Sequence, residues 1–279
     1  MILFPGNDIF AYRDPCAVFA DGACHLFFTL SEKDGGYMYN RLAYSRSTDL
    51  MHWSVPRCLT VRDRNLNFSS PGSVVRQGED YVLCFCSYPL PAPYRESPYA
   101  TDAARLYTLR TRDFLTFSDP VLLNPKGDGA PGRMIDPFLL EADGMYHLFF
   151  KQNGISRAVS RDLCHWDFLG RADGGENACV LPFRDRYLLI HSPENGLAFA
   201  TSHDLATWEP YAFTTLNQSS WDWAAGRLTA GFAVPMPEGA RHRYVLFFHG
   251  SRAVSPETHG NATLAAVFTD DFLAFSEEA

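Results

Sequence analysis

Three carboxylates in this 279-residue chain lie in short motifs that could carry out acid–base chemistry. Asp14 lies in RDP and Asp136 in IDPF, and each is followed by an Asp-Gly pair and a His-Leu-Phe-Phe run; Glu176 lies in GEN. Crowded carboxyl groups shift one another's pKa values, so that one can stay protonated while another is ionised. Hydrolysis of a glycosidic bond needs that division: one carboxyl group protonates the leaving oxygen, and another acts at the anomeric carbon or on the attacking water.

A single Asp before Pro would be explained as a residue that shapes the start of a strand. Asp14 and Asp136 stand in equivalent settings, however, and Glu176 joins them, so the three together favour a site over three unrelated strand ends. Asp21 and Asp143 belong to the Asp-Gly pairs and are expected to be structural residues of hairpin turns.

An eight-residue phrase recurs five times and indicates which elements position the acids. Its copies are STDLMHWS (47–54), TRDFLTFS (111–118), SRDLCHWD (160–167), SHDLATWE (202–209) and TDDFLAFS (269–276). Repetition at roughly 40–50 residues is typical of propellers and solenoids. We expect the Asp of the phrase to stabilise the turn between the third and fourth strands. The aromatic residue four positions later would pack between neighbouring blades, and the phrase itself would supply the fourth strand.

Each unit opens with two apolar runs separated by a polar turn, which is the pattern of a β-hairpin. No amphipathic helix of four turns is visible. The sequence therefore predicts an all-β fold: one five-bladed β-propeller domain over 1–279, with four antiparallel strands per blade. Innermost strands line the channel of a propeller, so Asp14, Asp136 and Glu176 would converge at its end. The predicted blades lie at about 10–57, 67–120, 133–170, 175–210 and 226–277.

Two insertions, 87–104 and 250–262, are rich in Pro, Ser and Ala. Such loops commonly shape a binding site on a rigid scaffold, but plain surface insertions are an equally open alternative.

Charge and composition exclude several classes of partner. The 24 Lys and Arg residues against 32 Asp and Glu give a net charge of −8, which argues against nucleic acid and anionic membranes. No apolar run approaches a membrane span of roughly 18 residues, and no signal peptide is visible. The seven cysteines lack zinc-site spacing, and Cys84 and Cys86 alternate within an apolar run. We expect a cytoplasmic protein with free thiols; its oligomeric state is not predicted.

The motifs RDP (13–15), IDPF (135–138) and GEN (175–177), in units one, three and four, resemble the five-bladed propeller glycosidases, most of all glycoside hydrolase family 43. The resemblance covers essentially the whole chain, because the blade repeat is shared. It implies that Asp14 is the general base that activates water, that Asp136 tunes and orients the acid, and that Glu176 is the general acid of an inverting hydrolase. The resemblance implies that the reaction requires no cofactor.

By the same resemblance the substrates would be short oligosaccharides or glycosides, with α-L-arabinofuranosides or β-xylosides expected first. Families 32 and 68 use the same three blades with a nucleophilic first Asp, and NFSSPGSVV (67–75) is similar to their serine-rich second-blade motif. A retaining β-fructosidase is thus one alternative, and a non-catalytic carbohydrate-binding propeller is another. A propeller phosphorylase would need basic residues for phosphate, and the sequence shows no such cluster near the acids.

The remaining candidates are weaker. The family resemblance allows His249 to lie at the channel centre beside a structural calcium ion. The alternative that its ring is bonded only to backbone groups is equally open. Arg227 could pair with Asp136 or with a sugar hydroxyl group. Trp221 and Trp223 could stack on a sugar ring or be buried at a blade junction. The other candidates are Asn177, which belongs to the GEN motif, and Arg13 and Arg133, which either hold the acids ionised or lie at the surface.

Overall fold

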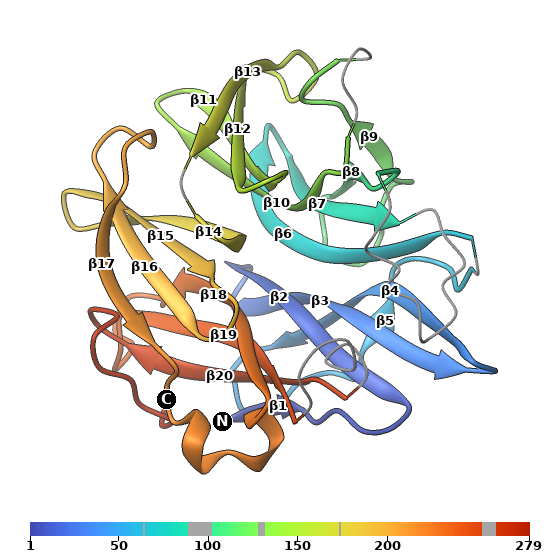
Figure 1. Ribbon diagram of the computed structural model, residues 1–279, viewed down its shortest axis with the longest axis vertical. Coiled ribbons are helices and arrows are strands. Elements are labelled where there is room, and N and C mark those ends of the chain that lie inside the picture. Colours follow the sequence, from blue (N-terminus) through green and yellow to red (C-terminus); the bar gives the residue numbers. More distant parts are fainter. Residues whose placement is uncertain (64, 89–101, 128–131, 173, 253–260) are drawn as a thin grey trace.

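Short apolar strands joined by tight turns make up most of the computed structural model, which describes residues 1–63, 65–88, 102–127, 132–172, 174–252 and 261–279. They form five antiparallel sheets of four strands, arranged as blades around a common centre (Figure 1). The prediction of an all-β, five-bladed propeller is confirmed. Two 3₁₀ helices, η1 (Gln218–Ser220) and η2 (Asp222–Ala224), separate the last two blades. Within the described ranges, no helix is long and apolar enough to cross a membrane.

The strands of each blade follow one another in space from the centre outward. Blade 1 consists of β2 (Phe10–Ala20), β3 (Ala23–Asp34), β4 (Tyr37–Ser47) and β5 (Arg57–Cys58). Blade 2 consists of β6 (Asn67–Gln77), β7 (Asp80–Tyr88), β8 (Arg105–Thr111) and β9 (Val121–Leu123). Blade 3 consists of β10 (Ile135–Ala142), β11 (Met145–Lys151), β12 (Ile155–Ser160) and β13 (Asp167–Ala172). Blade 4 consists of β14 (Glu176–Phe183), β15 (Arg186–Ser192), β16 (Leu197–Ser202) and β17 (Glu209–Thr214). Blade 5 consists of β18 (Arg227–Pro235), β19 (Tyr244–Ser251), β20 (Thr263–Thr269) and β1 (Ile2–Phe4).

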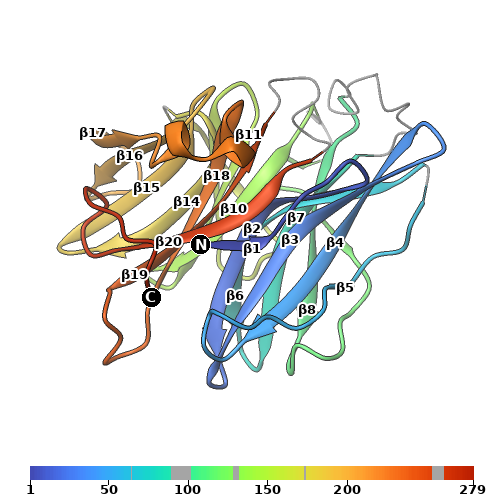
Figure 2. The same ribbon diagram turned by 90° about the horizontal axis from the view of Figure 1, so that it is seen from below.

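The innermost strands β2, β6, β10, β14 and β18 contact one another in a closed ring. Each blade begins with its innermost strand, so all five run in the same direction through the centre (Figures 1 and 2). Residues near the N-terminal ends of these strands therefore share one end of the channel, which is where the three acids of the sequence motifs lie.

The outermost strand of blade 5 comes from the other end of the chain. β1 pairs with β20 in register Ile2↔Ala265, and the Met1 ammonium group donates to the Ala266 carbonyl oxygen at 2.9 Å. This strand lies outside the segment predicted for the fifth blade. It also corrects the expectation that the repeated phrase supplies every fourth strand, because the last copy of the phrase is followed by no fourth strand.

The repeated phrase forms the turn that precedes the fourth strand. In the fourth copy, the Asp204 Oδ1 atom accepts hydrogen bonds from the N–H groups of Ala206 and Thr207, both at 2.8 Å. The same pair of bonds recurs in the other four copies. These bonds hold the pKa of Asp204 well below its usual range. The predicted turn role of the Asp is confirmed, whereas the strand assignment of the phrase was wrong in blades 1 to 4 as well.

The aromatic residue of the phrase packs across blade boundaries, as predicted. Trp53 of blade 1 lies 6.2 Å from Phe247 of blade 5, ring centre to ring centre. Trp208 of blade 4 lies 6.4 Å from Phe149 of blade 3. The turn aromatics of blades 2 and 5 pack in the same way, Phe117 on Phe27 and Phe275 on Phe199, so apolar contacts join these blades to the preceding ones.

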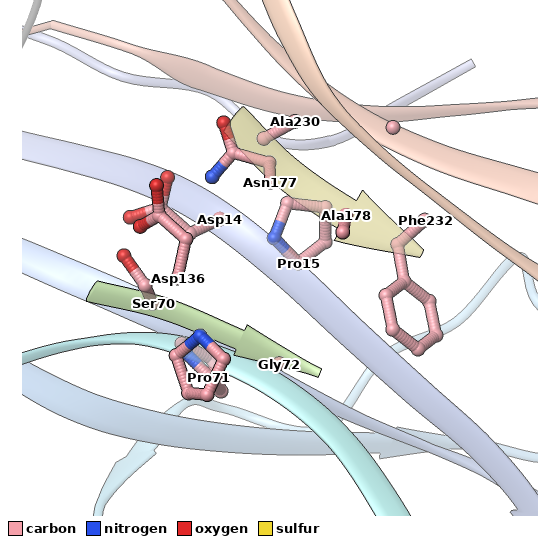
Figure 3. Close-up of a pocket in the computed structure, with 12 residues that line it drawn as sticks. Asp14, Pro15, Ser70, Pro71, Gly72, Asp136, Asn177, Ala178, Ala230 and Phe232 are labelled. Carbon is pink, nitrogen blue, oxygen red and sulfur yellow. The ribbon is translucent and has the colours of Figure 1, made fainter. Parts of the chain in front are cut away.

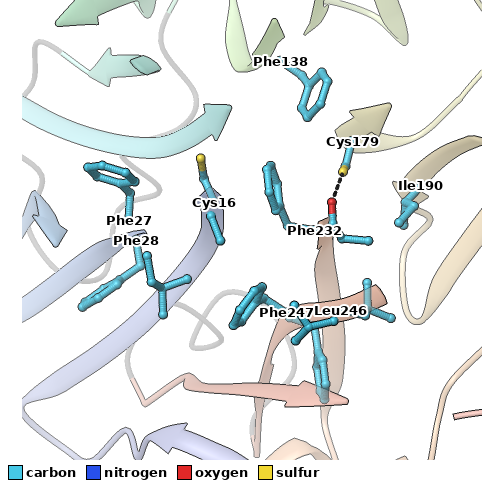
Figure 4. Packing of buried hydrophobic residues seen from close by; sticks show 14 of the residues in the cluster. Cys16, Phe27, Phe28, Phe138, Cys179, Ile190, Phe232, Leu246 and Phe247 are labelled. Atoms are coloured by element: carbon cyan, nitrogen blue, oxygen red, sulfur yellow. Dashed lines mark hydrogen bonds between the residues drawn. The ribbon is translucent and has the colours of Figure 1, made fainter. Parts of the chain in front are cut away.

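The channel is filled below the level of the acids. Cys16, Phe138, Cys179 and Phe232 come from four different innermost strands and are almost fully buried. They converge toward the centre, where the Cys179 thiol donates to the Ala233 carbonyl oxygen at 3.7 Å (Figure 4). A substrate can therefore approach the acids only from their own end of the channel. All seven cysteines are free, which confirms that expectation.

Candidate active site

All five innermost strands bend at the same place. Asp14, Ser70, Asp136, Asn177 and Ala230 have φ between 49° and 56°, and each coincides with a break in the register of its strand. Left-handed backbone is costly for residues with a side chain, and such strain clusters at functional sites. These bulges give the acids their places in the channel.

Asn177, rather than Glu176, is the counterpart of the two aspartates. Glu176 comes one position earlier in its bulge, like Arg13 in blade 1 and Ile135 in blade 3. The equivalent settings that the motifs indicated for Asp14 and Asp136 are thus found in the structure. Glu176 reaches the site from a different position of the strand.

Asp14 and Asp136 lie beside each other at a narrow cavity. Figure 3 shows their carboxylates close together, with the Ser70 hydroxyl and the Asn177 amide turned toward them. The cavity lined by these residues has a volume of about 20 Å³, which suffices for about one water molecule. Space for a sugar must therefore lie above the carboxylates. Gly72 is needed here, since a Cβ atom on it would lie 1.4 Å from the Pro137 carbonyl oxygen.

Asp14 is held by hydrogen bonds from two neighbouring strands. The Thr29 hydroxyl donates to its Oδ2 atom at 2.9 Å, and its own backbone N–H donates to His249 Nδ1 at 3.1 Å. Burial, Arg13 and Arg227 keep the pKa of His249 well below its usual value. The ring is therefore neutral, and because Nδ1 accepts a hydrogen bond, its proton is on Nε2.

Asp136 holds its proton up to a higher pH than an ordinary aspartic acid. Burial, with the charges of Glu176 and Asp14, raises its pKa to about 6, although Lys151 and a hydrogen bond from Ser70 oppose the rise. This carboxyl group therefore titrates closer to neutral pH than an ordinary aspartic acid, as suits a group that exchanges protons in a catalytic site.

Glu176 is bound between two cations. Its Oε1 atom accepts a hydrogen bond from Arg227 at 2.5 Å, and its Oε2 atom is paired with the Lys151 ammonium group. Burial alone would raise the pKa of Glu176, but Lys151 and Arg227 outweigh it and lower the pKa. Glu176 and Arg227 also line a cavity of about 870 Å³, which continues over blades 4 and 5.

The pairing of Glu176 corrects two expectations. The sequence showed no cluster of basic residues near the acids, yet Lys151 and Arg227 both contact Glu176. The sequence suggested that Arg227 pairs with Asp136 or with a sugar hydroxyl group; its carboxylate partner is Glu176, and a contact with a sugar stays a prediction. Lys151 was missed; its only signal was its place immediately after the His-Leu-Phe-Phe run, where Thr29 follows the same run in blade 1.

Lys151 occupies a position that has a structural role in the other blades. We define the clasp positions as the second-strand residues paired with the residue before each bulge. They are Thr29, Cys86, Lys151, Ser192 and His249. In four blades this side chain accepts a hydrogen bond from the bulge N–H of the next blade: Ser70 to Thr29 at 2.8 Å, Asp136 to Cys86, Ala230 to Ser192 at 2.7 Å, and Asp14 to His249 at 3.1 Å. A lysine ammonium group has no lone pair to accept such a bond.

The structure separates the remaining candidates. His249 is 7% exposed and supports Asp14 from behind. Arg13 is buried rather than at the surface, and its Nε atom donates to the Ser31 hydroxyl at 3.3 Å. Trp221 and Trp223 stack on each other and on Phe248 and are half-buried, so part of each ring is packed against blade 5, and stacking on a sugar stays a prediction. Neither lines the cavities of the three acids.

Metal binding stays a prediction. In the part of the chain that the structure describes, no three His, Cys, Asp or Glu side chains form a group suited to a metal ion. The insertions 87–104 and 250–262 fall largely outside the described residues, so their predicted role at the site is not addressed by the structure.

Comparison with known families agrees with this geometry. Residues 34–179, just over half of the chain, match the family model described as "Probable glycosyl hydrolase domain", a relative of family 43. The chain belongs to this family. It is a glycoside hydrolase of the family-43-like propeller type, as the motifs predicted. No curated sequence gives a significant match.

Solved structures show the same architecture at low sequence identity. Zg3597, a family 117 glycoside hydrolase of the marine bacterium Zobellia galactanivorans, is 15% identical with a TM-score of 0.70, over 95% of this chain and 87% of that one. The catalytic domain of a Coprinopsis cinerea family 62 α-L-arabinofuranosidase is 13% identical with a TM-score of 0.69, over 95% and 93%. RS223 β-xylosidase is 10% identical with a TM-score of 0.66, over 100% and 98%. These similarities establish the fold and leave the substrate of this glycoside hydrolase open.

Proposed function

We propose that this glycoside hydrolase cleaves short oligosaccharides or glycosides with inversion, using Asp14 as base, Asp136 as modulator and Glu176 as acid. The observation that carries the proposal is the meeting of Asp14 and Asp136 on strained bulges at the open end of a channel that is filled below them, with Glu176 beside them. Three carboxylates in one place favour different protonation states, which is the requirement of glycosidic hydrolysis.

In the proposed step, Asp14 accepts a proton from water as the water oxygen attacks the anomeric carbon. The bond from that carbon to the glycosidic oxygen breaks, and the leaving oxygen takes the proton of Glu176. The bonds from Thr29 and to His249 fix the orientation of Asp14, so the base needs little rearrangement to receive the proton.

Glu176 must be protonated to act as the acid, and its two cations oppose this. Lys151 and Arg227 lower its pKa, whereas a negative charge on Asp136 favours a proton on Glu176. Because the two carboxyl groups interact, they titrate as a pair that exchanges one proton. We therefore expect hydrolysis to be faster at mildly acidic than at neutral pH.

The expected substrates are α-L-arabinofuranosides or β-xylosides. The family resemblance supports them, and two of the similar structures are an arabinofuranosidase and a β-xylosidase by name. The filled channel supports a substrate that enters from one end only, as a short glycoside can. We further propose that the protein works on such glycosides in the cytoplasm.

A hydrolysis screen tests the proposal. Arabinofuranosides, xylosides, fructosides and galactosides are incubated with wild type and with Glu176→Gln at about pH 5 and about pH 7, and NMR follows the anomeric configuration of the first product. On substrates with poor leaving groups, Glu176→Gln should lose about 10²–10⁴-fold in rate while still binding sugar. Equal turnover by wild type and variant would refute the acid assignment, and retention of configuration would refute inversion and favour the fructosidase-type mechanism.

A further inference from the structure

A second cavity lies beside Glu176, on the blade 3 side. It has a volume of about 360 Å³, and its lining includes Arg133, Lys151, Gln152 and Asn153. Lys151 connects it with the proposed active site, because the same ammonium group pairs with the Glu176 carboxylate. A substrate whose scissile oxygen lies at Glu176 would therefore place a neighbouring group close to this cavity.

The cavity is positively charged, although the chain as a whole carries −8. Arg133 and Lys151 line it directly. Arg105 donates to the carbonyl oxygens of Asp102 at 2.7 Å and Gly132 at 3.2 Å, both of which line the cavity. Lys126 donates to Gln152 Oε1 at 2.6 Å. Among the described lining residues, Asp102 supplies the single carboxylate, so the cations are in excess.

Arg133, which lines the cavity, carries a donor that lacks an acceptor among the described residues. The Nε atom of Arg133 is buried and has no hydrogen-bond partner within the described ranges. A buried donor without a partner costs free energy, and a ligand oxygen would remove that cost. This observation is independent of the charge of the cavity and points to the same kind of ligand.

Lys151 is also unexpected on structural grounds. Four of the five clasp positions hold side chains that accept a hydrogen bond from the next blade, and blade 3 alone has a cation there. In blade 3 an ion pair with Glu176 of blade 4 replaces the hydrogen bond to the bulge N–H, and it brings a positive charge to the boundary of the active site and the cavity. A neutral acceptor at this position would join the blades as well but would not attract an anion into the cavity.

We propose that the cavity lined by Arg133, Lys151, Gln152 and Asn153 binds an anionic group, a carboxylate or a sulfate ester, on the unit next to the bond that is cleaved. The inference rests on the proposed function, since it takes the scissile oxygen to lie at Glu176. Arginine and lysine bind such oxyanions through charge-assisted hydrogen bonds. An anion that attracts Lys151 would also loosen its hold on Glu176, so the charged substrate would help to protonate its own acid.

The test compares aryl glycosides that differ only in charge. The sugar found in the screen is linked to 4-carboxyphenol, to its neutral isostere 4-carbamoylphenol, and to 4-sulfophenol as the sulfur oxyanion. For wild type, kcat/KM should be about 10-fold or more higher with the carboxylate or the sulfonate than with the amide. Whichever anion gives the larger ratio identifies the group that the cavity prefers. The ratio should fall as salt is added.

Two variants and a control make the test specific. Arg133→Gln should abolish the preference and Arg133→Lys should keep part of it. Arg184→Gln alters an exposed guanidinium group on the turn after β14, at the other end of this strand from Glu176, and should change nothing. Thermal melting of each variant verifies that it folds. A preference that survives Arg133→Gln in a folded protein would overturn the proposal.

Calorimetric titration with D-glucuronate and D-glucose separates failure of this inference from failure of the proposed function. If all three aryl glycosides are cleaved with equal kcat/KM, the inference is wrong and the proposed function stands. If none is cleaved but glucuronate binds to wild type and not to Arg133→Gln, the cavity is confirmed as an anion site and the proposed function is wrong. If none is cleaved and glucuronate binds no better than glucose, both are wrong.

Discussion

At the scale of single residues, the site depends on carboxyl groups placed where charge is costly. Asp136 is almost fully buried in strained backbone, with φ 50°, and has two carboxylates for neighbours. If this position had only a structural role, an uncharged side chain would make the folded protein more stable. The stability that Asp136 costs is therefore a measurable sign of function.

We predict that Asp136→Asn stabilises the protein at neutral and alkaline pH. The pKa of Asp136 is about 6 in the folded protein against 3.8 ordinarily, so between about pH 4 and 6 the folded state binds more protons than the unfolded chain, and wild-type stability falls as pH rises. Above this window the ionised carboxylate costs about 2–3 kcal/mol, which Asn would not incur.

Thermal or urea unfolding at about pH 8 and about pH 4 measures this effect. The variant should be the more stable protein at the higher pH, and the difference should vanish at the lower one, while glycoside hydrolysis is lost. Asp21→Asn is the matched control, because Asp21 has a similar φ of 49° but is exposed. A destabilised Asp136→Asn at pH 8 would contradict the prediction.

At the scale of strands, the blades are connected by the hydrogen bonds of the clasp positions, here called clasps, and these bonds also shape the site. The hydrogen bond that the Asp14 N–H donates to His249 positions Asp14 and also joins blade 1 to blade 5. Support for the base and closure of the ring are thus one interaction. Substitutions of clasp residues should for this reason affect stability and activity together.

Ser192, which pairs with Glu176 within blade 4, forms the clasp between blades 4 and 5. Its hydroxyl accepts the N–H of buried Ala230 at 2.7 Å, and Ser192→Ala would leave that donor without a partner at a cost of about 1–3 kcal/mol. Ser156→Ala is the matched control, since Ser156 is equally buried at 1% exposure but makes only a weak bond of 3.5 Å. Urea unfolding should show the larger loss for Ser192→Ala; equal losses would argue against the clasp.

Structural features that a repeated sequence pattern marks could be predicted from the sequence, whereas features without such a pattern could not. The five turns, the propeller and the RDP and IDPF motifs follow from spacing, because every blade repeats the same requirements. The contacts of Glu176 do not, since Lys151 and Arg227 meet it from adjacent blades at sequence separations of 25 and 51. The bulges were also invisible, because a left-handed residue such as Asn177 has no fixed sequence signature.

At the scale of the whole molecule, the ring is closed by β1. Phe4 is 9% exposed and packs on Phe28 of blade 1 at 5.1 Å and on Trp53 at 6.4 Å. A three-residue strand thus covers the edge of blade 5 and fills the boundary with blade 1. Because a closed propeller leaves few unpaired edges, loss of this strand would affect the entire ring.

We predict that Phe4→Ala lowers the free energy of unfolding by about 3–5 kcal/mol. Ile2→Ala on the same strand, where the side chain is 47% exposed, should change it by about 0.5 kcal/mol or less. Urea denaturation followed by tryptophan fluorescence measures both. Similar values for the two variants would mean that β1 contributes through its backbone pairing alone.

The pairing of β1 with β20 also sets the order in which the chain can be completed during synthesis. Met1 and Ala266 are hydrogen-bonded across 265 positions, and a ribosome adding about 5–20 residues per second needs at least about 13 seconds to span that distance. During this interval β1 has no partner strand, and the first blade is exposed on the side that blade 5 will cover. The protein is thus open to association with other nascent chains until its last blade emerges, and slower translation would prolong that exposure.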